Sequence, residues 1–258
     1  MNKLKVKKVM DFLIARNRSI RSNNPKISGW VDAYLRACLS SGKVVNILTP
    51  WSLSKAFEKR FIDQGNCFTP TQKERALFEL EIPKIAKIFK ENGFKLNWII
   101  FLSRAYLKNR LLKSEVECVY RKMVTNLVEN CCVEELTLVD WEDDVLEGRS
   151  SPNEEVMKDF EKYIKKGAFE YDFKRWKQWI LNEGKSFSDD QLREETKYQI
   201  ACEVNEGKLL LSENSPFGFN EFVFMPLGVP ERYVFFSIIT KDFRSRMVAV
   251  LPTYPWRI

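Results

Sequence analysis

The chain has 258 residues, a formal net charge of +7 and a 45% share of hydrophobic residues, which is enough apolar material for a sizeable core. Its longest apolar runs fall well short of the roughly 18 residues that span a bilayer, and its basic N-terminus lacks the apolar stretch of a signal peptide. It contains no histidine, which excludes Ser-His-Asp and Cys-His catalysis and histidine-bound zinc. We therefore expect a cytoplasmic protein without a membrane segment, folded as one domain over residues 1–258.

Charge is unevenly distributed along this chain. Residues 1–60 hold 13 Lys and Arg against 3 Asp and Glu, whereas residues 129–161 hold 2 against 12. This asymmetry indicates two binding surfaces of opposite sign, with a basic helix over about residues 1–22 suited to a polyanion. The alternative is that each charged segment only solvates the outer face of a helix.

The periodicity of apolar residues predicts alternating helices and strands in the first two-thirds of the chain. Val6, Val9, Met10 and Leu13 recur at helical spacing, so the first helix covers 3–21. The segments that follow are a helix over 28–40, a strand over 43–48, a turn over 49–55 that opens into a helix through Arg60, a helix from Thr69 to Gly93, a strand over 96–102, a helix over 114–128 and a strand over 136–141. Pro83 is expected to kink or break its helix, and Thr69 to cap it.

The last third is predicted to contain three helices and then three strands. The helices cover 152–166, 172–183 and 188–211, and the strands cover 222–225, 234–239 and 247–251. The order of elements favours an α/β fold with a mostly parallel sheet and helices on both faces. Ligands in such folds lie beyond the carboxyl ends of the strands, so segments 49–55 and 140–147 are expected near one crevice. Glycine is scarce and no Gly-x-Gly-x-x-Gly or Walker loop occurs, which argues against a nucleotide cofactor.

The segment after the first strand carries three hydroxyls, on Thr49, Ser52 and Ser54. A turn at a helix start can hold an oxyanion through its backbone N–H groups, and a hydroxyl there can act as a nucleophile if a base or the substrate accepts its proton. The simpler interpretation is a helix N-cap.

An acidic cluster follows the strand at 136–141. It comprises Asp140, Glu142, Asp143, Asp144 and Glu147. Like charges at this density cost free energy unless a cation lies among them. The cluster is suited to binding a guanidinium or ammonium group, to holding Mg²⁺ through Asp143, Asp144 and Glu147, or to supplying a general base. An acidic loop facing solvent is the structural alternative.

Three further features have both a structural and a functional interpretation. Glu203 lies on an apolar helical stripe, where it either forms a salt bridge or acts as a base. Trp51 and Trp141 adjoin the two candidate segments, so they either belong to the core or line a side-chain pocket. A basic helix, with Lys108, Arg110, Lys113, Arg121 and Lys122 around it, either binds RNA phosphate or is merely solvated.

Together these segments resemble the cyclodipeptide synthases, and specifically their arginine-using branch. Ile47 to Ser54 is similar to the strand and turn that bear the family's nucleophilic serine, with Thr49 at the simplest serine position and Ser52 three residues on. Asp143-Asp144-Val145-Leu146-Glu147 matches the Asp-Asp-x-x-Glu motif of the arginine-using branch. Glu203 matches the family's helical Glu, while Tyr198 is one residue out of register with the family's Tyr.

The resemblance implies a Rossmann-like domain that joins an arginyl group and a second aminoacyl group from charged tRNAs into a cyclic dipeptide. It implies no cofactor, no metal and no membrane partner. The catalytic residues would be Asp143, Asp144, Glu147, Glu203 and either Thr49 or Ser52, unless transfer between the tRNAs is direct. Trp51, Asp140, Trp141, Tyr198 and Gln199 would contact the substrate. The residues expected to bind tRNA are Lys3, Lys5, Lys7, Lys8, Arg16, Arg18, Arg21, Lys108, Arg110, Lys113, Arg121 and Lys122.

Two other function classes are compatible with the same residues. One is a Mg²⁺-dependent hydrolase or lyase that uses the acidic cluster, although lyases with such motifs are usually all-helical. The other is a non-catalytic tRNA-binding protein. A metal enzyme should lose activity in EDTA, and a binding protein should hold charged and uncharged tRNA alike and release no product.

Overall fold

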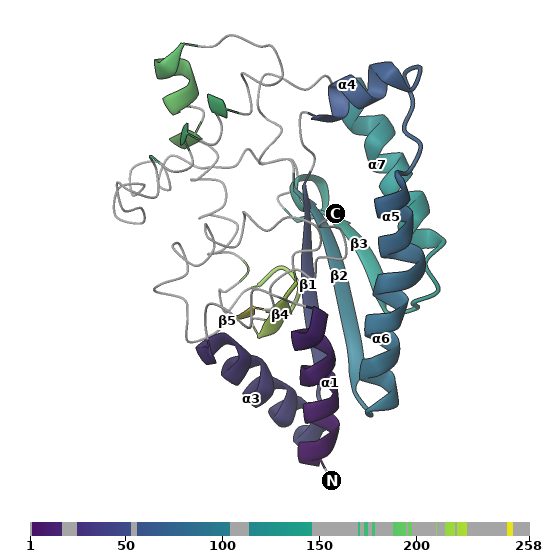
Figure 1. Ribbon diagram of the computed structural model, residues 1–258, viewed down its shortest axis with the longest axis vertical. Helices are drawn as coiled ribbons and strands as arrows, with labels where there is room; N and C mark the ends of the chain where they lie inside the picture. The colour runs from purple at the N-terminus through teal and green to yellow at the C-terminus, as the bar shows by residue number, and fades with distance from the viewer. Residues whose placement is uncertain are drawn as a thin grey trace.

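A parallel sheet forms the centre of the fold in the computed structural model (Figure 1). Its strands are β1 (Val44–Ser52), β2 (Lys95–Ser103), β3 (Leu136–Asp140), β4 (Phe222–Phe224) and β5 (Met247–Ala249). The order is β3-β2-β1-β4-β5 and every pair is parallel. This arrangement confirms the predicted α/β, Rossmann-like class, and the direction of strand addition reverses at β1.

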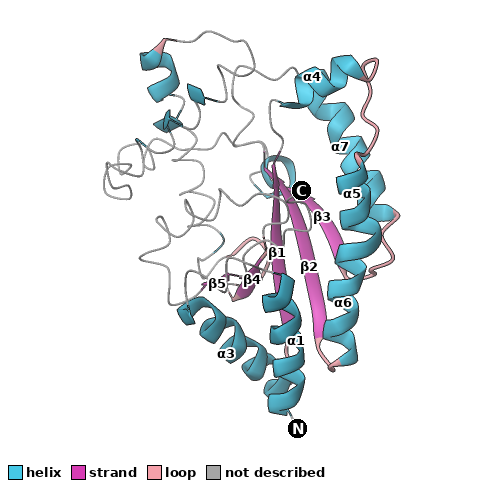
Figure 2. Cartoon of the chain, in the orientation of Figure 1, coloured by secondary structure: helices cyan, strands magenta, loops and turns pink. Residues whose placement is uncertain are grey.

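The structure describes most of the chain up to residue 145 and shorter stretches after it. The described residues are 2–16, 25–52, 56–103, 114–145, 170, 173–174, 177–178, 188–194, 196–197, 210, 215–219, 221–225 and 247–249. The helices are α1 (Asn2–Arg16), α3 (Pro25–Ser41), α4 (Ala56–Asp63), α5 (Gln72–Ala76), α6 (Ile82–Glu91) and α7 (Ser114–Glu129), with π-helical turns η1 (Leu77–Glu81) and η2 (Trp141–Val145). In Figure 2 the strands β1 to β3 run side by side, with α5, α6 and α7 along one side of them.

The larger apolar core lies on one face of the sheet. Val45 and Ile47 of β1 and Trp98 and Ile100 of β2 are fully buried there. The same cluster contains the apolar residues of α1, α3, α6 and α7, so these helices cover that face. A smaller cluster on the opposite face includes Phe101 and Trp141, with Leu210, Phe217 and Phe219 packed beside them. Most of the helices predicted over 152–211, and the strand predicted over 234–239, lie outside the described residues.

β1 is longer than the sequence predicted, because Thr49 to Ser52 continue the strand instead of forming a turn. The strand pairs with β2 along its whole length, up to Ser52 beside Ser103. Pro50 is tolerated because its nitrogen faces the β4 side, where the Leu48 carbonyl accepts the last hydrogen bond, from Met225 N–H at 2.8 Å. Among the described residues β1 pairs with β4 only at Ile47 and Leu48, so proline removes no ladder bond there.

The predicted break near Pro83 is present as a π-helical turn. Leu77–Glu81 separates α5 from α6, and Pro83 sits in the first turn of α6, where its missing N–H is not needed. The cap of α5 is Thr71 and not Thr69 as predicted. Thr71 Oγ1 accepts from Glu74 N–H at 3.2 Å and Glu74 Oε2 accepts from Thr71 N–H at 2.7 Å, which is a reciprocal capping box.

The predicted cap at Ser188 is confirmed by the same kind of exchange. Gln191 N–H donates to Ser188 Oγ and Ser188 N–H donates to Gln191 Oε1, each at 3.1 Å. The first helix also behaves as its periodicity predicts, because Val6, Val9 and Leu13 are buried while Lys3, Lys7 and Lys8 are exposed. Across the described part of the chain, no helix combines the length and apolarity needed to cross a membrane.

Candidate functional site

The two candidate segments lie at the same edge of the sheet, where the parallel strands have their carboxyl ends. β1 ends at Ser52 and β3 ends at Asp140, with β2 between them. Ser52 pairs with Ser103 and Asp140 with Leu102, so the two strand ends are offset by one residue. With strands about 4.8 Å apart, their backbones are about 10 Å apart across the sheet. Ser52 also ends the strand at which strand order reverses, where ligands of this fold class bind.

Thr49 lies in the core instead of at the strand end. Its side chain is completely buried, and its hydroxyl accepts a hydrogen bond of 2.9 Å from the Trp98 indole N–H. A nucleophile must reach the substrate carbonyl, and a hydroxyl in this position cannot do so. Ser52, three residues farther along at the end of β1, is therefore the better placed of the two candidates.

Thr49→Val is expected to destabilise the protein by about 1–3 kcal/mol, because it leaves the buried Trp98 N–H without its acceptor. Thr49→Ser keeps the hydroxyl and should lose about 1 kcal/mol, mainly from the missing methyl group. Urea unfolding followed by circular dichroism measures both. A Thr49→Val variant as stable as the wild type would show that the hydrogen bond to Trp98 contributes nothing.

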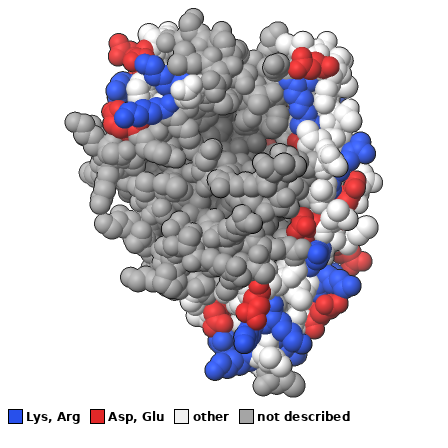
Figure 3. Space-filling view, viewed as in Figure 1, with Lys and Arg blue, Asp and Glu red and all other residues white. Residues whose placement is uncertain are grey.

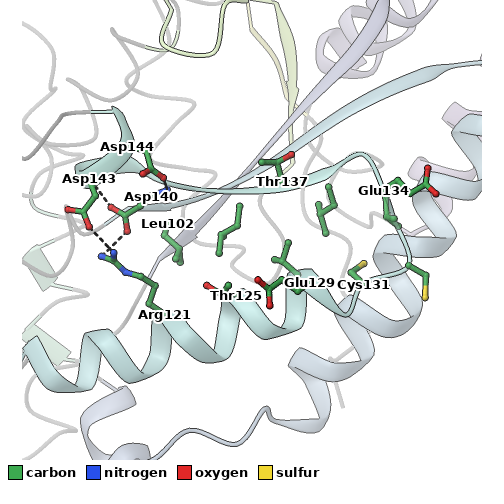
Figure 4. Close-up of a pocket in the computed structure, with 15 residues that line it drawn as sticks. Leu102, Arg121, Thr125, Glu129, Cys131, Glu134, Thr137, Asp140, Asp143 and Asp144 are labelled. Atoms are coloured by element: carbon green, nitrogen blue, oxygen red, sulfur yellow. Dashed lines mark hydrogen bonds and ion pairs between the residues drawn. The ribbon is translucent and has the colours of Figure 1, made fainter.

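The cation that the acidic cluster needs comes from the protein itself (Figure 4). Arg121 of α7 points at the end of β3, and its guanidinium lies 2.8 Å from both Asp140 Oδ2 and Asp143 Oδ2. Glu117, one helical turn before Arg121, is 3.3 Å away. Asp140 is 10% exposed, whereas Asp143 is 50% exposed. Arg121, which we predicted to bind tRNA, is thus engaged by three carboxylates of its own chain.

The acidic turn η2 is built by its own carboxylates. Asp140 Oδ1 accepts from Asp143 N–H at 2.8 Å, as an N-cap does. Asp144 Oδ2 reaches back and accepts from Asp140 N–H at 2.7 Å. Asp140 therefore has a structural role at the strand end, while Asp143 and Asp144 remain exposed at the surface of the turn.

A hollow of about 910 Å³ lies between β3 and α7. In Figure 4, Asp143, Asp144 and Arg121 stand at one end of it, and Cys131 and Glu134 at the other. Its lining also includes Leu102, Thr125, Val128, Glu129, Cys132, Val133, Leu136, Thr137, Leu138 and Asp140. Five of the lining side chains are acidic and one is basic, so the hollow favours a positively charged ligand. Neither Thr49 nor Ser52 lines it.

Burial raises the pKa of Cys131 to about 11, so this thiol is protonated at neutral pH.

The two tryptophans proposed to contact substrate lie in different apolar clusters. Trp141 is 1% exposed and packs on Phe101 and Phe217 at ring distances of 5.8 Å and 6.3 Å. Trp51 packs against the main core, 5.4 Å from Phe78. The two indoles therefore do not line one common pocket.

Sequence reasoning missed a buried polar network behind the end of β1. Trp51 Nε1–H donates to Tyr120 OH at 3.0 Å, and Tyr120 OH donates to Glu74 Oε1 at 3.3 Å. Glu74 also receives two hydrogen bonds from Arg60, at 2.9 Å and 2.8 Å. Burial, aided by the Glu74 carboxylate, raises the pKa of Tyr120, so its phenol stays neutral and can donate. The Thr71-x-x-Glu74 spacing was the visible signal, because it marks a capping box.

The described basic residues of the N-terminal helix are accessible. Lys3, Lys7 and Lys8 are exposed and Lys5 is half-buried. Figure 3 shows blue side chains gathered at the lower end of the view, where α1 begins, with red ones among them. Lys122 of α7 is exposed and borders a separate hollow of about 440 Å³.

Several proposed site residues lie outside the described part of the chain. They are Arg18, Arg21, Lys108, Arg110, Lys113, Glu147, Tyr198, Gln199 and Glu203, and the side chains of Arg16 and Ser52 are likewise not described. Within the described ranges, no group of three acidic or cysteine side chains is arranged to hold a metal ion. Comparison of the chain with protein-family models, curated proteins and solved structures gave no match.

Proposed function

We propose that this protein is a tRNA-dependent aminoacyltransferase that joins an arginyl group and a second aminoacyl group into a cyclic dipeptide. The observation that carries the proposal is the placement of Ser52 and the Asp143-Asp144 turn at one edge of a parallel sheet, about 10 Å apart, with Ser52 at the point where strand order reverses. An arginyl group can bridge such a distance, with its reacting carbonyl at β1 and its guanidinium at the acidic turn.

In the proposed reaction, the Ser52 hydroxyl attacks the ester carbon of the first aminoacyl-tRNA and the ribose oxygen leaves with a proton. The amine of the second aminoacyl-tRNA then attacks the new ester, which releases Ser52 and forms the peptide bond. Ring closure between the second ester and the first amine releases the cyclic product. An ester is already activated, so the reaction needs no nucleotide, and a carboxylate such as Glu203 can accept the amine proton in place of histidine.

The acidic turn is proposed to select arginine. Arg121 binds Asp140 and one oxygen of Asp143, and both Asp143 and Asp144 are exposed and border the hollow. A guanidinium that enters the hollow would meet these two carboxylates first, in the charge-assisted geometry that arginine favours. The exposed lysines of α1 would hold the tRNA backbone through salt-dependent contacts that read no sequence.

The test is to incubate the protein with arginyl-tRNA, alone and with each other aminoacyl-tRNA, and to detect cyclic dipeptides by mass spectrometry. We expect an arginine-containing product, and a loss of about 10- to 100-fold in the rate for Asp143→Asn or Asp144→Asn, because each removes a charged hydrogen bond worth about 1.5–3 kcal/mol. Asp63→Asn, at the exposed end of α4, is the matched control and should keep the full rate.

Two results would contradict this proposal. The first is the absence of any cyclic dipeptide from folded protein with every pairing of aminoacyl-tRNAs. If tRNA binds under the same conditions, charged and uncharged alike, the protein is a tRNA-binding protein without this activity. The second is an unchanged rate in both acidic-turn variants, which would remove the turn from arginine selection.

A further inference from the structure

The network behind the end of β1 is built from four elements of the fold. Arg60 belongs to α4, Glu74 to α5, Tyr120 to α7 and Trp51 to β1. These three helices meet beside the upper end of the sheet in Figure 1. The Arg60 and Glu74 side chains are 15% and 12% exposed, and Tyr120 is 1% exposed. A buried ion pair that is hydrogen-bonded on several sides holds one geometry, because any rearrangement leaves a charged group unpaired.

Each member of this network is held by more than one contact. Glu74 caps its own helix through Thr71 while it binds Arg60 and Tyr120. Arg60 also donates to the Thr69 carbonyl, and its guanidinium lies 5.3 Å from the centre of the Phe68 ring. The Tyr120 ring meets the same Phe68 edge-on at 5.1 Å. The Tyr120 phenol, which accepts a hydrogen bond from the Trp51 indole N–H, is therefore held in place both at its ring and at its hydroxyl.

Trp51 is the residue immediately before Ser52. An indole anchored at its N–H to a rigid phenol, and packed on Phe78, restrains the backbone at the carboxyl end of β1. Beyond Leu48, the described partner strand of β1 is β2 alone, so the side-chain contacts of Trp51 add to the pairing on that one side in holding this end. Catalytic groups must be held within a fraction of an ångström of their productive position. A network that restrains the end of β1 therefore acts on the reaction as well as on stability.

We propose that Arg60, Glu74, Tyr120 and Trp51 are positioning residues that hold the backbone at the carboxyl end of β1, and with it Ser52, in place for the reaction. The inference rests on the proposed function, since it assigns these residues to the same reaction. Tyr120 transmits the effect, because its hydroxyl links the Arg60–Glu74 pair to the Trp51 indole.

The test compares Tyr120→Phe with Tyr34→Phe. Tyr34 OH accepts from Asn46 N–H at 3.0 Å and donates to the Glu221 carbonyl at 3.2 Å, so it anchors the opposite end of the same strand. Both variants lose one tyrosine hydroxyl that accepts one hydrogen bond and donates another, but Tyr34 is only partly buried, so its stability loss should be the smaller of the two. Tyr120→Phe is expected to lower kcat for cyclic dipeptide formation about tenfold with an unchanged KM, whereas Tyr34→Phe should leave kcat within twofold of the wild type.

Hydrogen exchange supplies a second measurement that does not require activity. The peptide around residues 49–56 should exchange faster in Tyr120→Phe than in the wild type or in Tyr34→Phe, because the end of β1 loses its anchor. Equal kcat and equal exchange in the two variants would overturn the positioning role. A wild type that makes no cyclic dipeptide, combined with faster exchange in Tyr120→Phe, would instead overturn the proposed function and leave the anchoring of β1 supported.

Discussion

Glu74→Ala is expected to destabilise the protein by about 3–5 kcal/mol, because it leaves the Arg60 guanidinium as an unpaired charge in a largely buried position. The same change removes the capping box of α5 and the acceptor of the Tyr120 hydroxyl. After this change, the contacts already described for the Arg60 guanidinium are to neutral groups, the Thr69 carbonyl and the Phe68 ring. Its buried Nε has no hydrogen-bond partner within the described structure. Urea denaturation followed by circular dichroism measures the loss.

A matched control for Glu74→Ala is Glu91→Ala on α6. Glu91 pairs with Lys87 at 3.8 Å, but these side chains are 56% and 73% exposed, so the loss should be at most about 0.5 kcal/mol. Combining Arg60→Met with Glu74→Leu should restore part of the stability lost in Glu74→Ala, since no charge then remains buried. If the free energy of unfolding of Glu74→Ala lies within about 1 kcal/mol of the wild-type value, as expected for an exposed ion pair, the buried network does not stabilise the fold as proposed.

Arg121→Met is expected to cost about 2–4 kcal/mol, because it removes the guanidinium that binds three carboxylates, among them the 10% exposed Asp140. The estimate is below that for a fully buried pair, since Arg121 itself is 29% exposed. Repulsion among Glu117, Asp140 and Asp143 is then no longer offset by the Arg121 guanidinium. Because salt screens such repulsion, the difference from the wild type should shrink between 0.05 M and 1 M NaCl, as the Debye length falls to about 3 Å. Thermal and urea unfolding at several salt concentrations test this.

The appropriate control is Arg36→Met. Arg36 pairs with the single carboxylate of Asp32 on the surface of α3, with both side chains at least 33% exposed, so the loss should be below about 1 kcal/mol. Asp143→Asn should also cost little, since Asp143 is half exposed and Arg121 retains Asp140. A loss in Arg121→Met that equals the loss in Arg36→Met would show that the acidic turn does not depend on its internal cation.

Local sequence signals determined the class of the fold and most of its elements. The alternation of apolar strands with amphipathic helices predicted the parallel sheet, because burial of a strand or a helix face depends on a repeat that the sequence displays directly. Ser188 and Gln191 marked a helix start correctly for the same reason, as a cap involves residues three positions apart. The clustering of acids after β3 was also visible without a structure.

Only the tertiary structure decided which of these residues meet. The sequence predicted that Thr49 lies in a turn, but Thr49 is buried in β1, where its hydroxyl accepts a hydrogen bond from Trp98 of the neighbouring strand β2. Arg121 looked like an RNA-binding residue, and the packing of α7 against β3 made it the cation of the acidic turn. Glu74, Tyr120 and Trp51 are 23 to 69 residues apart in sequence, and no local period records their contact. Long-range pairing depends on how elements pack, and that is information that spacing along a chain does not contain.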